Sequence, residues 1–356
     1  MSFRFLLSGH DTIEVCYYLQ PGPGCQINFF DIGLKREALR QSKRRDPVFL
    51  KLGDIDFLLK PSGSRNGYPI VMENADYVVE FGEFNDPSFR VKLRSKALWR
   101  SGAQVLHERF MVWSRTIGLV ATKPESLSRV DFTFDYEIKE VDFDEDSVLS
   151  LSVKDNKYRD SGKLNGLVFG KGDVVLRIYD KVLEIDQQSH KEWFFQLWNQ
   201  QEDVWRIEWQ VRQEHLRRFG IRTFADLDGQ QGDLLRYLAE SHDTMRIQQS
   251  DSNRSRWPTH PLWLDLQERI QDFNCQGILR EIDDIEAIEE RLMRIAISVY
   301  GYLKRLAALR SVQHSLDPMP AQRAQSELKA LLDIVHDKMT WQTDVENRMK
   351  LIRLGQ

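Results

Sequence analysis

The sequence predicts an α+β fold, in which an antiparallel β-sheet with packed helices is followed by an all-α C-terminal region. Up to about residue 220, apolar and polar side chains mostly alternate, which is typical of strands with one buried face. Turns rich in Gly, Pro and Asn-Asp separate the alternating segments, as expected for an antiparallel sheet. After Gly220, apolar side chains recur at helical spacing instead.

The expected elements follow in this order along the chain. Strands are predicted at residues 13–19, 49–59, 75–81, 88–93, 128–136, 164–169, 173–181 and 204–212, with helices at 102–118 and 144–153 packed on the sheet. Helical segments at 225–245 and 262–273 flank a polar linker at 248–261, and a helical hairpin of residues 284–311 and 320–354 ends the chain. This order predicts a β-rich segment at 1–75, a core at 76–225 and a helical region at 226–356.

The composition excludes several classes of protein. The 356 residues include 50 Lys and Arg and 54 Asp and Glu, and the formal net charge of −4 excludes a globally basic, histone-like protein. The cysteines, Cys16, Cys25 and Cys275, show no CxxC spacing, so neither a disulfide framework nor a structural zinc site is expected. The sequence contains neither a signal peptide pattern nor an apolar stretch long enough for a membrane span. We therefore expect a cytoplasmic protein without membrane contact.

Three of the predicted strands carry ionisable side chains opposite their apolar ones. The polar face collects Asp131 and Asp135 from 128–136, Arg177, Tyr179 and Lys181 from 173–181, and Glu208 from 204–212. Several carboxylates on one face suit Mg²⁺ or Mn²⁺, which prefer oxygen ligands. A solvated sheet face with cross-strand ion pairs gives the same alternation, so both interpretations stay open on the pattern alone. The sequence contains no HxH, HExxH, GxGxxG, GxxxxGK[ST] or GxSxG motif.

The same three segments resemble those of a known family. SRVDFTFDY, LNGLVFGKGDVVLRIYDKVLE and WRIEWQVR, in this order and spacing, are similar to the motifs of the replication initiation factor family. That family comprises rolling-circle replication initiators and relaxases of plasmids, integrative elements and filamentous phages. The likeness covers about residues 75–225, and the flanks, which include LLSGHDTIEVCYYL, look most like the filamentous-phage members.

The resemblance implies a metal-dependent enzyme that nicks one DNA strand at a replication origin and later rejoins it. Tyr179 matches the family's nucleophile, which forms a 5'-phosphotyrosyl intermediate and leaves a free 3'-hydroxyl as a primer. Origin DNA, single-stranded or in a hairpin, is the implied substrate, and a host DNA polymerase and helicase are the implied partners. A non-catalytic origin-binding regulatory protein and a metal-dependent nuclease that uses water are the alternatives.

Physical chemistry assigns roles to the neighbours of Tyr179. A phenol with an ordinary pKa near 10 is a poor nucleophile at neutral pH, so Arg177 and Lys181 are expected to favour its phenolate. Arg177 is also suited to hold a phosphate oxygen. Asp131, Glu208 and Asp135 are the expected ligands of the divalent metal.

Two basic segments are the candidates for DNA contacts, because each neutralised phosphate strengthens binding. The first supplies Lys35, Arg36, Arg40, Lys43, Arg44 and Arg45, and the second supplies Arg90, Lys92, Arg94, Lys96 and Arg100. Such runs also occur on ordinary solvated faces. The predicted helix at 284–311 combines an apolar stripe with basic side chains, which fits a bundle helix, the helix of a homodimer or a DNA-contacting helix.

Overall fold

A computed structural model describes residues 3–42, 46–160, 162–271, 284–314, 317–337 and 339–353. The described residues form two compact units, one up to Gln271 and one from Asp284 to Arg353. The first unit contains the sheet and every predicted site residue that the structure describes, and the second unit is helical. The α+β prediction is therefore confirmed.

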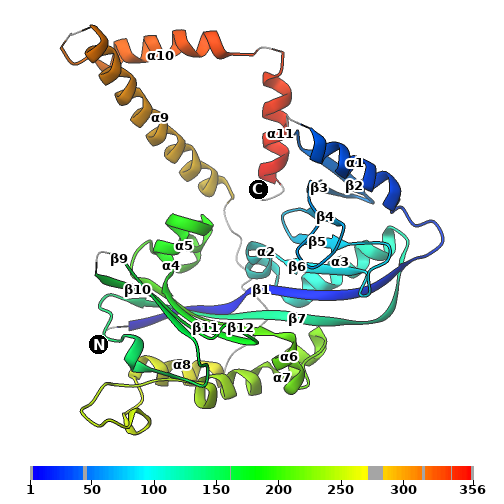
Figure 1. Ribbon diagram of the computed structural model, residues 1–356, viewed down its shortest axis with the longest axis vertical. Coiled ribbons are helices and arrows are strands. Elements are labelled where there is room, and N and C mark those ends of the chain that lie inside the picture. The colour runs from blue at the N-terminus through cyan, green and yellow to red at the C-terminus, as the bar shows by residue number, and fades with distance from the viewer. Residues whose placement is uncertain are drawn as a thin grey trace. The chain divides into compact units, whose positions relative to one another are not determined.

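An 11-stranded antiparallel sheet organises the first unit (Figure 1). In spatial order its strands are β2 (Val48–Leu52), β3 (Ile55–Leu59), β4 (Ile70–Glu73), β5 (Tyr77–Phe81), β6 (Phe89–Leu93), β1 (Phe3–Pro21), β7 (Leu119–Ile138), β12 (Val204–Arg212), β11 (Val174–Asp180), β10 (Lys163–Phe169) and β9 (Asp155–Asp160). The long strands β1 and β7 pair along most of their length and join the two halves of the sheet. The strands β1–β6 thus share one sheet with β7 and β9–β12, and the boundary expected at 75 falls between the hydrogen-bonded neighbours β4 and β5.

One face of β7 and β12 carries the apolar side chains that the alternation predicts. Helices α6 (Gln213–Arg218), α7 (Phe224–Tyr237) and α8 (Pro261–Gln271) lie along this face (Figure 1). Trp209 of β12, for example, meets Trp263 of α8 edge-on at a centroid distance of 5.6 Å. Elsewhere on the sheet, α3 (Ala103–Thr116) packs through Phe110, which stacks on Tyr17 of β1 at 4.6 Å.

A second layer covers the opposite face of β1, β7 and β12. It consists of α2 (Ser95–Ser101), α4 (Lys181–Glu184), a π-helical turn (Ile185–Ser189) and α5 (Trp193–Trp198), and we call these segments the covering layer. Phe194 of α5 packs edge-on against Trp99 of α2 at 5.6 Å. Trp99 in turn lies directly over Gly9 of β1, where an added Cβ would stand 2.8 Å from the indole ring. The glycine therefore lets α2 approach the strand closely.

The remaining elements complete the two units. They are α1 (Phe29–Gln41), β8 (Val148–Ser150), which pairs with β13 (Asp243–Met245), short 3₁₀ turns at Glu145–Ser147 and Arg254–Arg256, and a π-helical turn at Leu238–His242. The second unit contains α9 (Asp284–His314), α10 (Ala321–Val335) and α11 (Trp341–Arg353). An ion pair of 2.9 Å between Arg310 and Glu327 links α9 to α10. Among the described residues, none of the helices has the length and apolar character needed to cross a bilayer.

Several predicted elements differ from the structure. The strand expected at 49–59 is a hairpin of β2 and β3, because Gly53 turns the chain with a φ of 65°. The helix expected at 144–153 is a single 3₁₀ turn capped by Asp144, which ends where Val148 pairs with Met245 of β13. The long helix expected at 320–354 is interrupted at His336, whose backbone is extended. The helical region expected from 226 begins inside α7, and residues up to 271 belong with the sheet.

Candidate active site

The register of three strands brings most of the predicted site residues together. The strands β7, β12 and β11 are consecutive neighbours, so their polar faces form one surface. Tyr179 lies opposite Arg206, which in turn lies opposite Asp135. Two residues further along each strand, on the same face, Arg177 lies opposite Glu208. The predicted convergence of these side chains is therefore confirmed.

This polar surface is not solvated, in contrast to the ordinary sheet face that the pattern also allowed. Arg206 and Asp135 are 0% exposed, and Asp131 is 2% exposed. The covering layer encloses Asp135 and Arg206: Nε1 of Trp198 donates to Asp135 at 2.9 Å, and the Arg206 guanidinium stacks on Phe194 at 4.4 Å. Buried charges require partners, so nearly every ionisable group here is paired.

Tyr179 is held by a carboxylate. Its hydroxyl donates to Oε2 of Glu208 at 3.0 Å, and Oε1 of Glu208 accepts from Arg177 at 3.0 Å. Burial and the negative charge of Glu208 raise the pKa of Tyr179 well above its ordinary value, although the Arg206 charge acts in the opposite direction. The expectation that Arg177 and Lys181 lower the pKa of Tyr179 is therefore wrong for the protein without DNA, because burial and the charge of Glu208 outweigh the neighbouring cations.

Lys181 does not continue the strand as predicted but begins α4. Its side chain is 1% exposed, pairs with Glu184, and lies 5.6 Å from the centroid of the Tyr179 ring. Burial, together with the charge of Arg206, lowers the pKa of Lys181. Asp180 caps the same helix by accepting from the backbone nitrogen of Leu183 at 2.9 Å.

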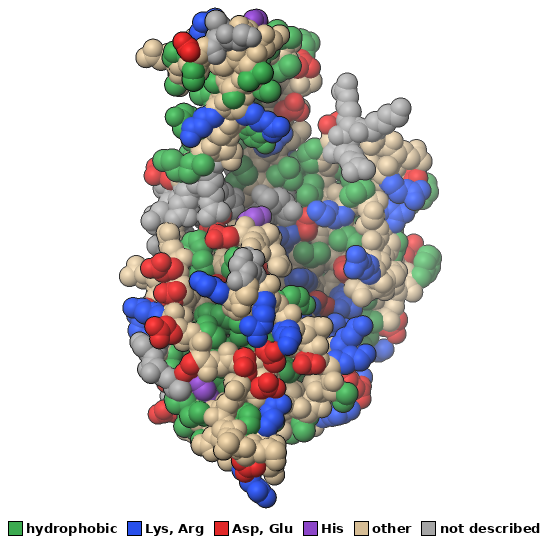
Figure 2. Space-filling view, turned by 60° about the vertical axis from the view of Figure 1, so that its left-hand side comes forward, with side chains coloured by type: hydrophobic (Ala, Val, Ile, Leu, Met, Phe, Trp, Pro, Cys, Tyr) green, Lys and Arg blue, Asp and Glu red, His purple; other side chains and the backbone are tan. Residues whose placement is uncertain are grey.

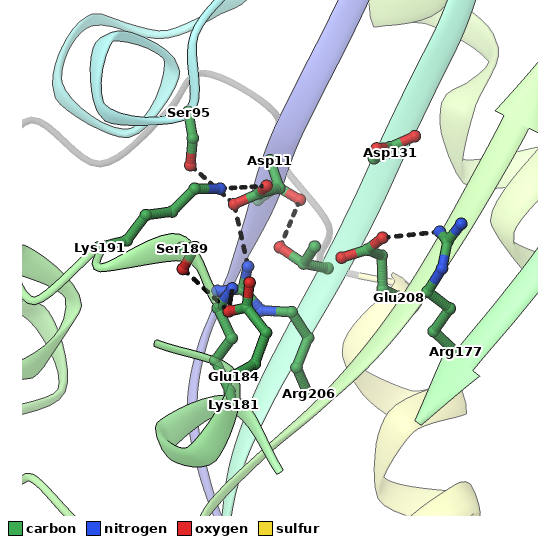
Figure 3. A network of polar contacts seen from close by, with 12 residues as sticks. Asp11, Ser95, Asp131, Arg177, Lys181, Glu184, Ser189, Lys191, Arg206 and Glu208 are labelled. Atoms are coloured by element: carbon green, nitrogen blue, oxygen red, sulfur yellow. Dashed lines mark hydrogen bonds and ion pairs between the residues drawn. The ribbon is translucent and has the colours of Figure 1, made fainter. Parts of the chain in front are cut away.

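Asp131 and Glu208 are the two predicted metal ligands with suitable surroundings. Both lie on the same face of neighbouring strands (Figure 3). Asp131 accepts two hydrogen bonds from Arg129, of 2.8 and 2.5 Å. Burial raises the pKa of Asp131 to about 7, against the effect of Arg129 and with a further contribution from the Glu208 charge. A cation held by these two carboxylates would offset the cost of burying their charge, and carboxylate oxygens are the ligands that a hard cation prefers.

Asp135 does not share this setting. Arg206 donates to both of its oxygens, at 2.6 and 2.8 Å, and Trp198 donates to one of them. Asp135 lies four positions along β7 from Asp131, roughly 13 Å, which is too far for both to bind one ion. In the part of the chain that the structure describes, no three His, Cys, Asp or Glu side chains lie close enough to hold a metal ion. A metal site here would therefore rest on two carboxylates, and Asp135 is a partner of Arg206.

Asp11 is an important member of the site that the sequence did not indicate. Its carboxylate accepts from Ser95 at 2.7 Å, from Lys191 at 2.8 Å and from Arg206 at 3.0 Å (Figure 3). Burial acts to raise the pKa of Asp11, but the charges of Lys191 and Arg206 hold it well below its ordinary value. Asp11 of β1 is therefore bonded to α2 through Ser95, to the segment before α5 through Lys191, and to β12 through Arg206. It falls at an irregularity in the pairing of β1 with β7, where simple alternation gives no signal.

The basic candidates fall into separate groups. Lys35, Arg36 and Arg40 lie on α1, Arg94, Lys96 and Arg100 lie at or within α2, and Lys43, Arg44 and Arg45 lie outside the described residues. Arg90 and Lys92 lie on β6, where Lys92 pairs in register with Glu14 of β1 and Glu14 with Arg129 of β7. Arg90 also forms an ion pair with Glu14. A polar stripe, formed by Lys92, Glu14, Arg129 and Asp131, therefore crosses β6, β1 and β7.

The visible surface charge is mixed rather than uniformly basic. Figure 2 shows Lys and Arg side chains lying among Asp and Glu side chains. Many of the candidates are also paired, as Arg94 is with Glu73 at 2.6 Å and Arg100 with Asp76 at 3.4 Å. Lys92 is exposed, in register with the stripe, and is the strongest of the basic candidates by position.

Comparison with known proteins gives a likeness in structure alone. No family model matches the chain, and no curated protein matches it. Among solved structures, it is similar to a rolling circle replication initiator protein from Geobacillus stearothermophilus, with a TM-score of 0.45 and 16% sequence identity. That match covers 78% of this chain and 100% of the other.

Proposed function

We propose that this protein is a rolling-circle DNA replication initiator that nicks one strand at its origin through Tyr179. The observation that carries the proposal is the pairing of a tyrosine with a buried carboxylate, Glu208, on a face rich in arginine and lysine. The three-segment resemblance to replication initiation factors supports the same assignment, because its tyrosine motif falls on this residue.

The geometry suggests how the reaction would begin. Glu208 accepts the phenolic proton of Tyr179, and the phenolate oxygen then attacks the scissile phosphorus. The bond from phosphorus to the 3' oxygen breaks, and that oxygen takes up a proton. The products are a 5'-phosphotyrosyl protein and a free 3'-hydroxyl, which would serve a host DNA polymerase working with a host helicase. Attack by the 3'-hydroxyl of a completed strand on the phosphotyrosine reverses these steps and rejoins the DNA.

The surrounding cations would act on the phosphate. Arg177 lies one row from Tyr179 and donates to Glu208 and to Gln210, at 3.0 and 3.1 Å, so it can exchange one of these partners for a phosphate oxygen. A bound phosphate would bring negative charge to Arg177 and Lys181. Lys181 is already buried beside the tyrosine ring, where it needs no movement to contribute its charge.

Asp131 and Glu208 would hold a divalent cation, Mg²⁺ or Mn²⁺. Mg²⁺ is often bound by one or two carboxylates, with water and substrate phosphate completing its coordination. When bound, such a cation supplies positive charge that polarises a phosphate oxygen. Asp135 is left out of this proposal, because its oxygens are bound by Trp198 and by the fully buried Arg206, whereas Asp131 is bound by the partly exposed Arg129.

A covalent-trapping assay tests the proposal. The purified protein is incubated with Mn²⁺ and with single-stranded fragments tiled across its own replicon, and protein–DNA adducts are resolved on denaturing gels. The wild type should form a metal-dependent adduct that Tyr179→Phe abolishes. The matched control is Tyr302→Phe, since Tyr302 is 70% exposed and lies in the second unit.

The alternatives predict other results. Cleavage without an adduct would indicate a nuclease that uses water. Origin binding without cleavage under any metal condition would indicate a non-catalytic binding protein.

A further inference from the structure

A second tyrosine lies beside Tyr179 on the same face of the sheet. Gly166 of β10 pairs with Tyr179 of β11 on one side and with Tyr158 of β9 on the other. A Cβ built on Gly166 would stand 3.4 Å from Cβ of Tyr179 and 3.7 Å from Cδ2 of Tyr158. Both side chains therefore rise on the side where Gly166 has none, and two strand spacings, roughly 10 Å, separate their backbones.

The glycine between them is not required by the local backbone or packing. Its φ is not among the positive values of the chain, and an added Cβ would make only ordinary van der Waals contacts. Glycine inside a strand weakens the strand, and it often marks a place where a ligand approaches closely. The sheet surface at Gly166 is such a place, because it lies between Tyr179, the proposed nucleophile, and the ring of Tyr158.

Tyr158 has the exposure that a ligand contact needs. It lies on β9, the edge strand of the sheet, and is 54% exposed. Within the residues that the structure describes, its hydroxyl makes no hydrogen bond, so the side chain is not committed to another structural contact. Arg177 of β11 lies two residues from Tyr179, opposite Val168 of β10, and supplies positive charge on the same face of the sheet.

We propose that Tyr158 is a base-stacking platform for single-stranded DNA, and that it holds a base at the edge of the sheet next to the scissile phosphate. Every base presents a flat aromatic face, so an exposed tyrosine can stack on it without sequence preference. Stacking at Tyr158 would fix the strand on one side of Tyr179, while Arg177 contacts the backbone. This role deepens the proposed function, on which it rests for the identity of the ligand.

The test measures DNA binding without nicking. In a Tyr179→Phe background, the affinity for a fluorescein-labelled oligothymidylate is determined by anisotropy at fixed salt. Tyr158→Ala should weaken binding roughly 5- to 150-fold, the range seen when one stacking aromatic is removed. Tyr158→Phe keeps the ring and should bind within about twofold of the parent. Tyr302→Ala, an exposed tyrosine of the second unit, is the control and should have no effect.

A second variant addresses the glycine between the two tyrosines. Gly166→Ala adds one methyl group against the ring of Tyr158 and beside Tyr179, and should weaken binding while the melting temperature stays equal or rises. Tyr158→Ala that binds like the parent would overturn the proposal. So would a loss of binding that is fully explained by a lower melting temperature, because Tyr158 would then only shield Gly166.

The result of this binding test does not depend on the result of the covalent-trapping assay for the proposed function. Binding in the Tyr179→Phe background does not depend on whether the wild type forms an adduct. If Tyr158→Phe binds normally but cannot rejoin a nicked strand in the otherwise wild-type protein, Tyr158 is a second nucleophile and the stacking role is overturned.

Discussion

Tyr179 and Arg177 share one carboxylate, because the phenol donates to Oε2 of Glu208 and the guanidinium to Oε1, each at 3.0 Å. Glu208→Gln keeps a hydrogen-bond acceptor but removes the charge that raises the pKa of Tyr179. A lower phenol pKa alone would speed attack. We nevertheless expect adduct formation to fall about 100-fold or more, because a general base and metal ligand is lost.

The measurement is the initial rate of adduct formation by wild type, Glu208→Gln and the exposed control Glu83→Gln. A variant that reacts as fast as the wild type, or faster, would show that Glu208 only hinders the phenol.

Asp135→Ala should destabilise the protein by about 3–5 kcal/mol, because it leaves the fully buried Arg206 without its main partner. Asp31→Ala removes an exposed ion pair with Lys35 and should cost less than about 1 kcal/mol. Urea denaturation of both variants measures the difference. Equal stabilities would show that Asp135 is not the structural partner of Arg206.

Asp11→Asn should loosen the covering layer while leaving the sheet intact. Asp11 accepts from Ser95 of α2 and from Lys191 beside α5, and hydrogen bonds to charged groups contribute about 1.5–3 kcal/mol. Hydrogen exchange followed by mass spectrometry should show faster exchange in peptides spanning 185–198, with β7 unchanged. The control, Asp233→Asn, breaks an exposed ion pair with Arg236 and should leave that region protected.

Lys92→Ala should weaken DNA binding and make it less dependent on salt. If Lys92 neutralises one phosphate, its loss lowers the slope of log affinity against log salt by about 1. Fluorescence anisotropy at several salt concentrations measures this slope. Lys139→Ala, which removes an exposed lysine at the end of β7, should leave the slope unchanged. An unchanged slope in Lys92→Ala would place the DNA elsewhere.

His10 should make stability depend on pH. Burial lowers the pKa of His10 to about 3, so the unfolded chain binds a proton between that pH and about 6.5 that the folded chain does not. Stability therefore falls as the pH drops through this window, by up to about 1.4 kcal/mol per pH unit from this group.

Burial lowers the pKa of His215 and His260 as well, so the total slope in the wild type should be steeper. His10→Gln should show a shallower slope between about pH 6.5 and 4.5, whereas the exposed His314→Gln should match the wild type. Urea denaturation across this range measures both, and equal slopes for wild type and His10→Gln would contradict the assignment.

Which residues lie on the polar face could be predicted from the sequence, because alternation alone decides which side of a strand a residue occupies. Asp131, Tyr179 and Glu208 all lie where this period of two places them. The enclosure of that face could not be predicted in the same way. Phe194 and Trp198 have the composition of an ordinary core helix, and nothing local indicates that they lie over arginine and aspartate.

Contacts between residues far apart in the sequence could not be predicted from the alternation of side chains either. Asp11 and Arg206 are 195 residues apart in the chain, yet their side chains are 3.0 Å apart. The helix expected at 144–153 failed for a related reason, since a pairing with β13 almost a hundred residues later decides the conformation of β8.

The absence of a Cβ atom at Gly9 sets the distance between the sheet and α2. Any side chain at Gly9 would collide with Trp99, which is 1% exposed and has no room to move aside. The helix would have to rise as a body, and its first residue, Ser95, would be drawn off Asp11. A methyl group at Gly9 would thus act on the charge balance around Arg206 without touching any ionisable group. Position 9 is consequently expected to tolerate substitution less than many residues of the polar face itself.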